Sequence, residues 1–233
     1  MRVLNTGCGT GESTFLAATL VGPAGLVVGV DTDHAALSAA RRAADQACAV
    51  NVAFTEGDCT GPAMLGQAPF DAVVGRFSLI HQDDPALTLR QLARLVRPGG
   101  VMAFLEPELD YDLLTAPAIP LADQLHAWLR AGYRNAGLQT NIATAFPRLF
   151  LEAGLGWPSV RAYQTVSAAG TAGVCASLVN PVEKLLPVVS RSLRRTAGEM
   201  SAGDLMARLA EALLEAGGVT AGAPIAGAWV SVG

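Results

Sequence analysis

A glycine-rich loop close to the N-terminus constrains the fold of this chain more than any other feature. The apolar segment Arg2–Asn5 leads into the loop Gly7–Gly11, and a helix is predicted over Glu12–Leu20. Glycine permits positive φ and lets a ligand approach the backbone closely, while a helix N-terminus offers unpaired N–H groups to an anionic group. The spacing is G-x-G-x-G followed by Glu12, which differs from the G-x-G-x-x-G of dinucleotide-binding folds. The chain therefore opens with a strand, a candidate ligand-binding loop and a helix.

Strands and helices alternate through the first half of the chain. After the loop, further strands are predicted at Leu26–Val30, Asn51–Thr55, Phe70–Val74 and Val101–Leu105. A helix follows Asp33, and another is predicted over Ala86–Val96, where leucines recur at helical spacing. The strands are almost continuously apolar, which is typical of a parallel sheet covered on both faces.

The second half is predicted to be mostly helical. Helices are expected over Leu121–Gly132, Ala143–Ala153, Pro181–Leu193 and Ala202–Ala216, and strands at Val160–Val166 and Ala226–Val232. A stretch rich in Ala, Gly and Ser, Ser167–Ser177, lies between them. The sequence shows no internal repeat, so the simplest account is one domain with helical insertions.

Two acidic residues follow predicted strands at the edge where open α/β sheets bind ligands. Asp31 can accept hydrogen bonds from both hydroxyls of a ribose. The alternative is that it caps the next helix, although Asp33 is better placed to do so. Asp58 follows the third strand and can accept from an adenine amino group; a simple Gly-Asp turn is the alternative there.

Five segments in order resemble the motifs of class I S-adenosylmethionine-dependent methyltransferases. They are Val3–Gly11, Gly29–Asp31, Glu56–Asp58, Phe70–Val74 and Leu95–Gly100. The resemblance covers residues 2–107 and is greatest to the small-molecule branch, the relatives of the ubiquinone and menaquinone methylases. It implies an α/β, Rossmann-like, doubly wound sheet of order 3-2-1-4-5-7-6, with strand seven antiparallel and helical insertions late in the chain. One methyltransferase domain over 1–233 is then expected. Its parts are a cofactor-binding half (2–107), substrate-side insertions around strand six (108–225) and strand seven (226–232).

The resemblance implies S-adenosyl-L-methionine as the cofactor. The glycine loop would hold its methionine portion, Asp31 its ribose, and Asp58 and Cys59 its base. The residues expected at the cofactor are Asn5, Gly7, Cys8, Gly9, Thr10, Gly11, Asp31, Thr32, Gly57, Asp58, Cys59, Arg76 and Phe77. The chain departs from the family in two ways: Asn5 stands where an acid is usual, and Met1 leads almost directly into strand one, where the family normally has one or two helices first.

Methyl transfer from an activated cofactor needs mainly positioning and exclusion of water. A base is needed only when the acceptor arrives protonated, and His81, after strand four, is the candidate. A purely structural histidine is the alternative. Glu106, His126 and Tyr133 are predicted on the substrate side, with a solvated loop carboxylate as the alternative for Glu106.

Composition narrows the class of partner. The net charge of −4 argues against nucleic acid as the main partner. The chain is 51% hydrophobic and 15% charged, which favours an apolar substrate pocket or a homodimer interface. Neither the cysteines nor the three histidines have metal-ligand spacing, so no metal is expected. No apolar run reaches the length of a membrane span, and a cytoplasmic protein is expected.

Three functions stay open on the sequence alone. The first is methyl transfer to a small, apolar metabolite, such as a secondary metabolite or a quinone-like ring. The second is a methyltransferase-like protein that binds the cofactor or a substrate without methyl transfer, as a cyclase, an isomerase or a silent partner. The third is a nucleotide-dependent oxidoreductase, against which Glu12 argues because the dinucleotide fingerprint has its third glycine near this point.

Overall fold

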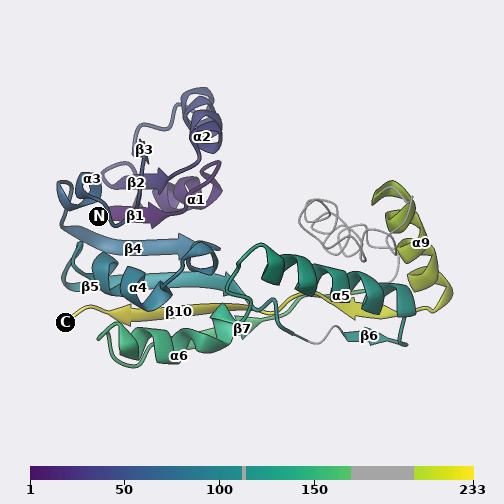
Figure 1. Cartoon of the computed structure of the whole chain (residues 1–233). Coiled ribbons are helices and arrows are strands. Elements are labelled where there is room, and N and C mark those ends of the chain that lie inside the picture. Colours follow the sequence, from purple (N-terminus) through teal and green to yellow (C-terminus); the bar gives the residue numbers. More distant parts are fainter. Residues whose placement is uncertain (112–113, 169–201) are drawn as a thin grey trace. The chain divides into compact units, whose positions relative to one another are not determined.

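The computed structural model describes residues 1–111, 114–168 and 202–233, and its strands form two sheets (Figure 1). A seven-stranded sheet has the order β3-β2-β1-β4-β5-β10-β7, and a three-stranded sheet has the order β6-β9-β8. The chain divides into two compact units. The sheet unit comprises Met1–Glu106, Ile142–Arg161 and Ala226–Gly233, and the insertion unit comprises Pro107–Asn141 and Ala162–Ile225.

The large sheet has the predicted order and the predicted antiparallel strand. Its strands are β1 (Arg2–Thr6), β2 (Leu26–Asp31), β3 (Val52–Glu56), β4 (Phe70–Arg76), β5 (Val96–Pro107), β7 (Ser159–Tyr163) and β10 (Ile225–Ser231). Strand β1 pairs in parallel with β2 and β4, β2 pairs in parallel with β3, and β4 with β5. Strand β10 runs opposite to β5, since Val232 N–H donates to Gly100 C=O at one end and Glu108 N–H donates to Pro224 C=O at the other. The prediction of a Rossmann-like sheet is confirmed.

Helices of the sheet unit follow the strands as alternation predicts. They are α1 (Glu12–Val21), α2 (His34–Gln46), α3 (Pro62–Leu65), the 3-10 helix η1 (Leu79–His81), α4 (Pro85–Ala93) and α6 (Ile142–Glu152). Leu89 and Leu92 of α4 and Phe146 and Phe150 of α6 are fully buried, and Phe150 contacts Phe104 of β5 edge-on. Burial of each such side chain stabilises the fold by about 1.5–3 kcal/mol.

Three predicted elements have wrong boundaries. The helix predicted over Ala86–Val96 ends at Ala93, because Val96 already pairs with Phe70 in the sheet. The turn predicted at Arg97–Gly100 lies inside β5 as an irregularity, with Gly99 at φ +73°. The strand predicted at Val160–Val166 is two strands, β7 and β8 (Val166–Ala168), which belong to different sheets.

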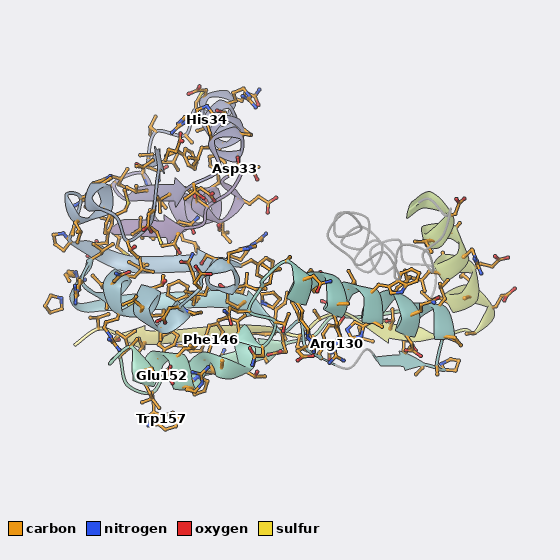
Figure 2. All side chains as sticks on the ribbon, in the orientation of Figure 1. Asp33, His34, Arg130, Phe146, Glu152 and Trp157 are labelled. Atoms are coloured by element: carbon orange, nitrogen blue, oxygen red, sulfur yellow. The ribbon has the colours of Figure 1, made fainter. Side chains whose placement is uncertain are left out.

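The described part of the insertion unit contains the three-stranded sheet and two long helices. Its elements are β6 (Leu114–Ala116), α5 (Pro120–Asn135), β8, α9 (Ala202–Glu215) and β9 (Val219–Ala221), and both β6 and β8 pair with β9 in antiparallel fashion. Helix α5 is connected to the segment that follows β5 by Arg130 (labelled in Figure 2) and Arg134, which both pair with Asp110. These guanidinium groups, Arg134 foremost, lower the pKa of Asp110.

Some sequence predictions lie outside what the structure describes. The helix predicted at Pro181–Leu193 and most of the stretch Ser167–Ser177 fall there. The prediction that 1–233 form one domain, with parts 2–107, 108–225 and 226–232, stays a prediction. Among the described helices, none combines the length and apolarity needed to cross a membrane.

Candidate functional site

A pocket of about 720 Å³ lies in the sheet unit at the carboxyl ends of β1 to β4. Ligand sites of open α/β sheets occur at this edge. Of the residues predicted at the site, the lining includes Gly7, Gly9, Asp31, Thr32, Gly57, Asp58, Cys59, Phe77 and His81. The pocket is also lined by residues that were not predicted at the cofactor or the substrate, namely Thr6, Val30, Asp33, Ser78, Leu79, Gln82 and Thr88. The position of Ser78 and Leu79 directly after β4 was the signal that could have identified them.

The glycine loop takes backbone conformations that glycine alone adopts readily. Gly7, Gly9 and Gly11 have φ values of +59°, +53° and +92°. A Cβ at Gly7 would lie 2.8 Å from Ser78 Cβ, and one at Gly11 would lie 2.9 Å from the ring of Phe15. A Cβ at Gly9 would meet no atom within 4 Å. Gly7 and Gly11 are thus required by packing as well as by φ, whereas Gly9 faces open space.

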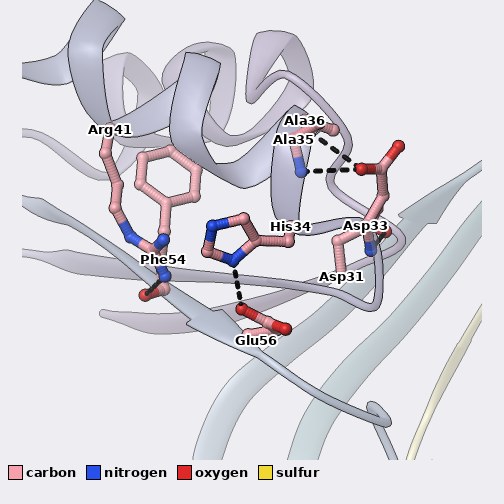
Figure 3. A network of polar contacts seen from close by, with 8 residues as sticks. All are labelled: Asp31, Asp33, His34, Ala35, Ala36, Arg41, Phe54 and Glu56. Carbon is pink, nitrogen blue, oxygen red and sulfur yellow. Dashed lines mark hydrogen bonds and ion pairs between the residues drawn. The ribbon is translucent and has the colours of Figure 1, made fainter.

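Asp31 holds the loop from the end of β2. Its Oδ2 accepts from Gly9 N–H at 2.7 Å, and its Oδ1 accepts from Asp33 N–H at 2.9 Å. Figure 3 shows that helix capping is done by Asp33 instead, whose Oδ1 accepts from the amides of Ala35 and Ala36. Each carboxylate oxygen of Asp31 has capacity for a further hydrogen bond, so Asp31 can bind a ligand hydroxyl while it holds Gly9.

Asn5 lies beneath the loop rather than in the lining of the pocket. It is fully buried, and its Nδ2 donates to Ser13 Oγ at 2.9 Å and to Thr14 Oγ1 at 2.8 Å. Its Oδ1 has no hydrogen-bond partner within the described part of the chain. Asn5 therefore connects β1 to the first turn of α1, the turn whose N–H groups follow the glycine loop.

Arg76 and Phe77 shape the pocket at the end of β4. Phe77 has φ +56°, which is uncommon for a residue with a side chain. The guanidinium group of Arg76 lies 5.1 Å from the centre of the Phe77 ring and pairs with Glu12 Oε2 at 3.2 Å. Arg76, Cys8, Thr10 and Gly11, which were predicted at the cofactor, are not among the lining residues.

The thiols near the pocket are neutral. Burial, followed by the neighbouring Asp58 carboxylate, raises the pKa of Cys59 to about 12. Burial and Asp31 raise the pKa of Cys8 to the same level. Neither thiol is thus a nucleophile near neutral pH, and Cys59 offers the pocket an apolar surface. No cluster of three metal-ligating side chains occurs within the described ranges.

The predicted substrate-side residues belong to two different units. Glu106 is fully buried in the sheet unit, where its carboxylate accepts from the amides of Ser78 and Leu79 at 2.9 and 2.8 Å. His126 and Tyr133 line a second pocket, of about 90 Å³, inside the insertion unit. The sequence did not point to Tyr111, but the centre of its ring lies 4.5 Å from the centre of the His126 ring. Burial raises the pKa of Tyr133, and that of Tyr111 to about 12, so both phenols are neutral.

Known proteins resemble this chain chiefly over its first half. Residues 1–144 match the model of a family described as "Methyltransferase domain". The 2-phytyl-1,4-naphtoquinone methyltransferase of Synechococcus elongatus is 36% identical over 114 residues, 48% of each chain. The aklanonic acid methyltransferase of Streptomyces sp. strain C5 is 34% identical over 106 residues, 46% of this chain and 48% of that protein. The chain thus spans about half the length of the curated relatives it matches.

A solved structure resembles the chain over its whole length. The YcgJ protein from Bacillus subtilis has a TM-score of 0.58 at 14% sequence identity, with 99% of this chain and 91% of that chain covered. At this level of identity the likeness shows the fold alone.

Proposed function

The chain belongs to this methyltransferase domain family, and we propose that it transfers a methyl group from S-adenosylmethionine to a small, apolar metabolite. The sequence prediction of an S-adenosylmethionine-dependent family is confirmed by this membership. The observation that carries the proposal is the pocket of about 720 Å³, where the glycine loop and Asp31 meet. Pockets that bury compact organic ligands have volumes of about 300–1,000 Å³, so the space suits a nucleoside with an amino-acid arm.

The residues of the pocket fit the parts of this cofactor. Gly7 and Gly9 have no side chain to obstruct the methionine arm, and Gly9 faces open space. Asp31 has acceptor capacity for the ribose hydroxyls. Thr32, Asp58 and Cys59 lie along the same pocket, where a carboxylate can accept from the adenine amino group and the neutral thiol can contact the ring.

When bound, the cofactor supplies a methyl group already activated by a sulfonium centre. The chain then has to orient the acceptor and exclude water. His81 lies exposed in the lining of the pocket, and we assign it the role of accepting the proton when the acceptor is a hydroxyl or phenol. An acceptor that arrives deprotonated does not need this step.

We assign acceptor recognition to the pocket of the insertion unit. Leu109, Leu129 and Ala223 give it apolar walls, and the neutral phenols of Tyr111 and Tyr133 are hydrogen-bond donors. His126 is buried against Tyr111. At about 90 Å³ the pocket has room for no more than a small substituent of the acceptor, such as a carbonyl or hydroxyl group. The expected effect of Tyr133→Phe is a raised KM for the acceptor with the affinity for the cofactor unchanged.

The remaining expectations concern partners and location. A net charge of −4 supports a function without nucleic acid. Trp157, directed outward in Figure 2 and 75% exposed, and Leu151, 40% exposed, give the sheet unit apolar surface that a homodimer would bury. We propose a homodimer in the cytoplasm; analytical ultracentrifugation tests the dimer, and fractionation of the cells tests the location.

Titration calorimetry with S-adenosylhomocysteine tests cofactor binding. The wild type should bind, and Asp31→Ala should weaken binding by about tenfold or more, the usual effect of losing hydrogen bonds to a charged group. Asp45→Ala, which removes a carboxylate from α2 outside the pocket, is the matched control. Absence of heat and of a thermal shift at millimolar ligand contradicts the proposal.

Methyl transfer is tested separately with a labelled methyl group and a panel of hydroxylated aromatic and quinone-like compounds. A labelled product supports the proposal. Cofactor binding without a labelled product from any compound favours the methyltransferase-like alternative.

A further inference from the structure

The buried carboxylate of Glu106 binds three consecutive backbone amides. Glu106 lies near the end of β5 and is fully buried. Its Oε1 accepts from Ser78 N–H at 2.9 Å and Leu79 N–H at 2.8 Å, and its Oε2 accepts from Ile80 N–H at 3.4 Å. A buried carboxyl group is costly unless its oxygens are satisfied, and successive amides of a turn form a concave site that satisfies them. The contact therefore fixes the segment that joins β4 to η1.

This segment needs external support because its backbone is strained. Phe77 has φ +56°, a region that disfavours residues with a side chain. Its N–H donates to Leu105 C=O at 2.9 Å, one residue before Glu106. The end of β5 thus holds the segment at consecutive residues, through a backbone carbonyl and then a carboxylate.

Ser78 connects this segment to the glycine loop by direct contact. Its Oγ lies 3.3 Å from Thr6 Oγ1. A Cβ at Gly7 would lie 2.8 Å from Ser78 Cβ, and a Cβ at Gly75 would lie 2.4 Å from Ser78 Oγ. Ser78 therefore lies against Gly7 of the loop and Gly75 of β4, and neither glycine has room for a Cβ. A shift of the Ser78 backbone would displace the glycine loop or leave a gap between the loop and Ser78.

We propose that Glu106 is a positioning residue of the cofactor pocket, which sets the distance between the glycine loop and the wall formed by Phe77, Ser78 and Leu79. These three residues line the pocket, whereas Glu106 does not, so it acts through them and does not touch the ligand. The inference rests on the proposed function for the identity of the ligand, S-adenosylmethionine. The placement of the wall itself does not depend on that identity.

The test compares the wild type with Glu106→Gln, which keeps the shape but turns an amide NH₂ toward the amides. Hydrogen–deuterium exchange is measured without ligand, and S-adenosylhomocysteine affinity is measured by calorimetry. We expect faster exchange at residues 78–80 with exchange in β1 and β2 unchanged. We also expect affinity reduced by about tenfold, as for loss of hydrogen bonds to a charged group. Unchanged local exchange and affinity would overturn the proposal, as would a uniform rise in exchange across the sheet.

Two further variants keep the test decisive. Asp71→Asn removes a carboxylate at the other end of β4, where it binds Arg2 N–H and Arg97, and should leave residues 78–80 and the affinity unchanged. If Glu106→Gln does not fold, Ser78→Val replaces it. This variant enlarges the side chain beside Gly7 and Gly75 and leaves Glu106 unchanged, and affinity should fall. Unchanged affinity in Ser78→Val overturns the proposal. If the wild type itself fails to bind the ligand, the proposed function fails, and the exchange pattern still decides the role of Glu106.

Discussion

The pockets of the two units are built from different parts of the chain. In the sheet unit the pocket depends on the backbone: positive-φ glycines at Gly7 and Gly9, and amides held by Asp31 and Glu106. In the insertion unit the pocket depends on side chains, chiefly aromatic rings such as Tyr111 and Tyr133. A backbone-built pocket requires glycines and acids at fixed spacing, which leaves a motif in the sequence. A side-chain pocket tolerates exchange of one ring for another and leaves none.

The largest effect that this comparison predicts is at Gly7. In Gly7→Val the valine must keep the backbone angle φ +59°, and its Cβ would lie 2.8 Å from Ser78 Cβ, so Ser78 must move. Left-handed backbone costs a residue with a side chain about 1–2 kcal/mol, and overpacking costs about 1–3 kcal/mol more. We expect S-adenosylhomocysteine affinity to fall at least about a hundredfold, the result of roughly 3 kcal/mol, as measured by calorimetry.

The control lies in the insertion unit. Gly137 follows α5 with φ +75°, and a Cβ there would meet no atom within 4 Å. Gly137→Ala carries the same kind of backbone strain without the close contact, so it should lower stability slightly and leave cofactor affinity unchanged. If both variants lose binding equally, backbone strain anywhere in the chain is enough, and the contrast between the units fails.

The large sheet could be predicted because its signals are local. Apolar strands alternate with periodic helices, a glycine loop follows the first strand, and the resemblance supplied the order of strands. The small sheet left no such signal: β6, β8 and β9 have three residues each, too few for an alternating pattern. The strand predicted at Val160–Val166 merged β7 with β8 for the same reason, since nothing in the sequence marks the break between them.

Residues of the candidate site that belong to local motifs could be predicted from the sequence. Contacts between residues of neighbouring strands could not. Asp31 and Gly9 belong to separate motifs, and both were found from spacing. Glu106 was predicted at the substrate because it follows a strand at the pocket edge. The structure shows its carboxylate buried against the amides of Ser78 and Leu79, 28 and 27 residues earlier in the chain. Such a contact depends on the pairing of β4 with β5, which no local pattern encodes; contact of Glu106 with a substrate stays untested.

The second prediction concerns the pH dependence of stability, which we expect from the sheet unit and not from the pocket of the insertion unit. Burial, partly offset by the amides of Leu79, Ser78 and Ile80, raises the pKa of Glu106 from 4.5 to about 7. The folded state therefore holds this proton more tightly than the unfolded state. The contribution of Glu106 to stability is full below about pH 4.5 and is lost as pH rises through about 7. The phenols of the insertion pocket have raised pKa values, that of Tyr111 about 12, and add no dependence in this window.

Urea unfolding of the wild type and of Glu106→Gln, between about pH 4.5 and pH 8, checks this prediction. The free energy of unfolding of the wild type, relative to that of the variant, should decline with rising pH and level off above about 7. A difference that does not change with pH contradicts it.

The third prediction is smaller and concerns the cap of α2. Asp33 Oδ1 accepts from Ala35 N–H and Ala36 N–H, and Asp33→Ala should cost about 1 kcal/mol, the usual effect of losing a helix N-cap. Asp84→Ala is the matched control, because Asp84 caps α4 through Leu87 N–H but does not line the pocket. Thermal unfolding should place the two variants close together, while only Asp33→Ala lowers cofactor affinity. Equal affinities would mean that Asp33 acts on the helix alone.

The smallest effect on stability is expected for the exposed pair of His34 and Glu56, which lies near Asp33 in Figure 3. His34 Nδ1 lies 2.8 Å from Glu56 Oε2 (Figure 3), but the two side chains are 73% and 50% exposed. Water and salt screen such a pair, which is worth about 0–1 kcal/mol. Chemical denaturation of His34→Ala should therefore give a free energy of unfolding within about 0.5 kcal/mol of the wild type. A loss as large as that of Asp33→Ala would show that exposed side-chain pairs, and not only contacts to the backbone, hold the binding edge of the sheet unit.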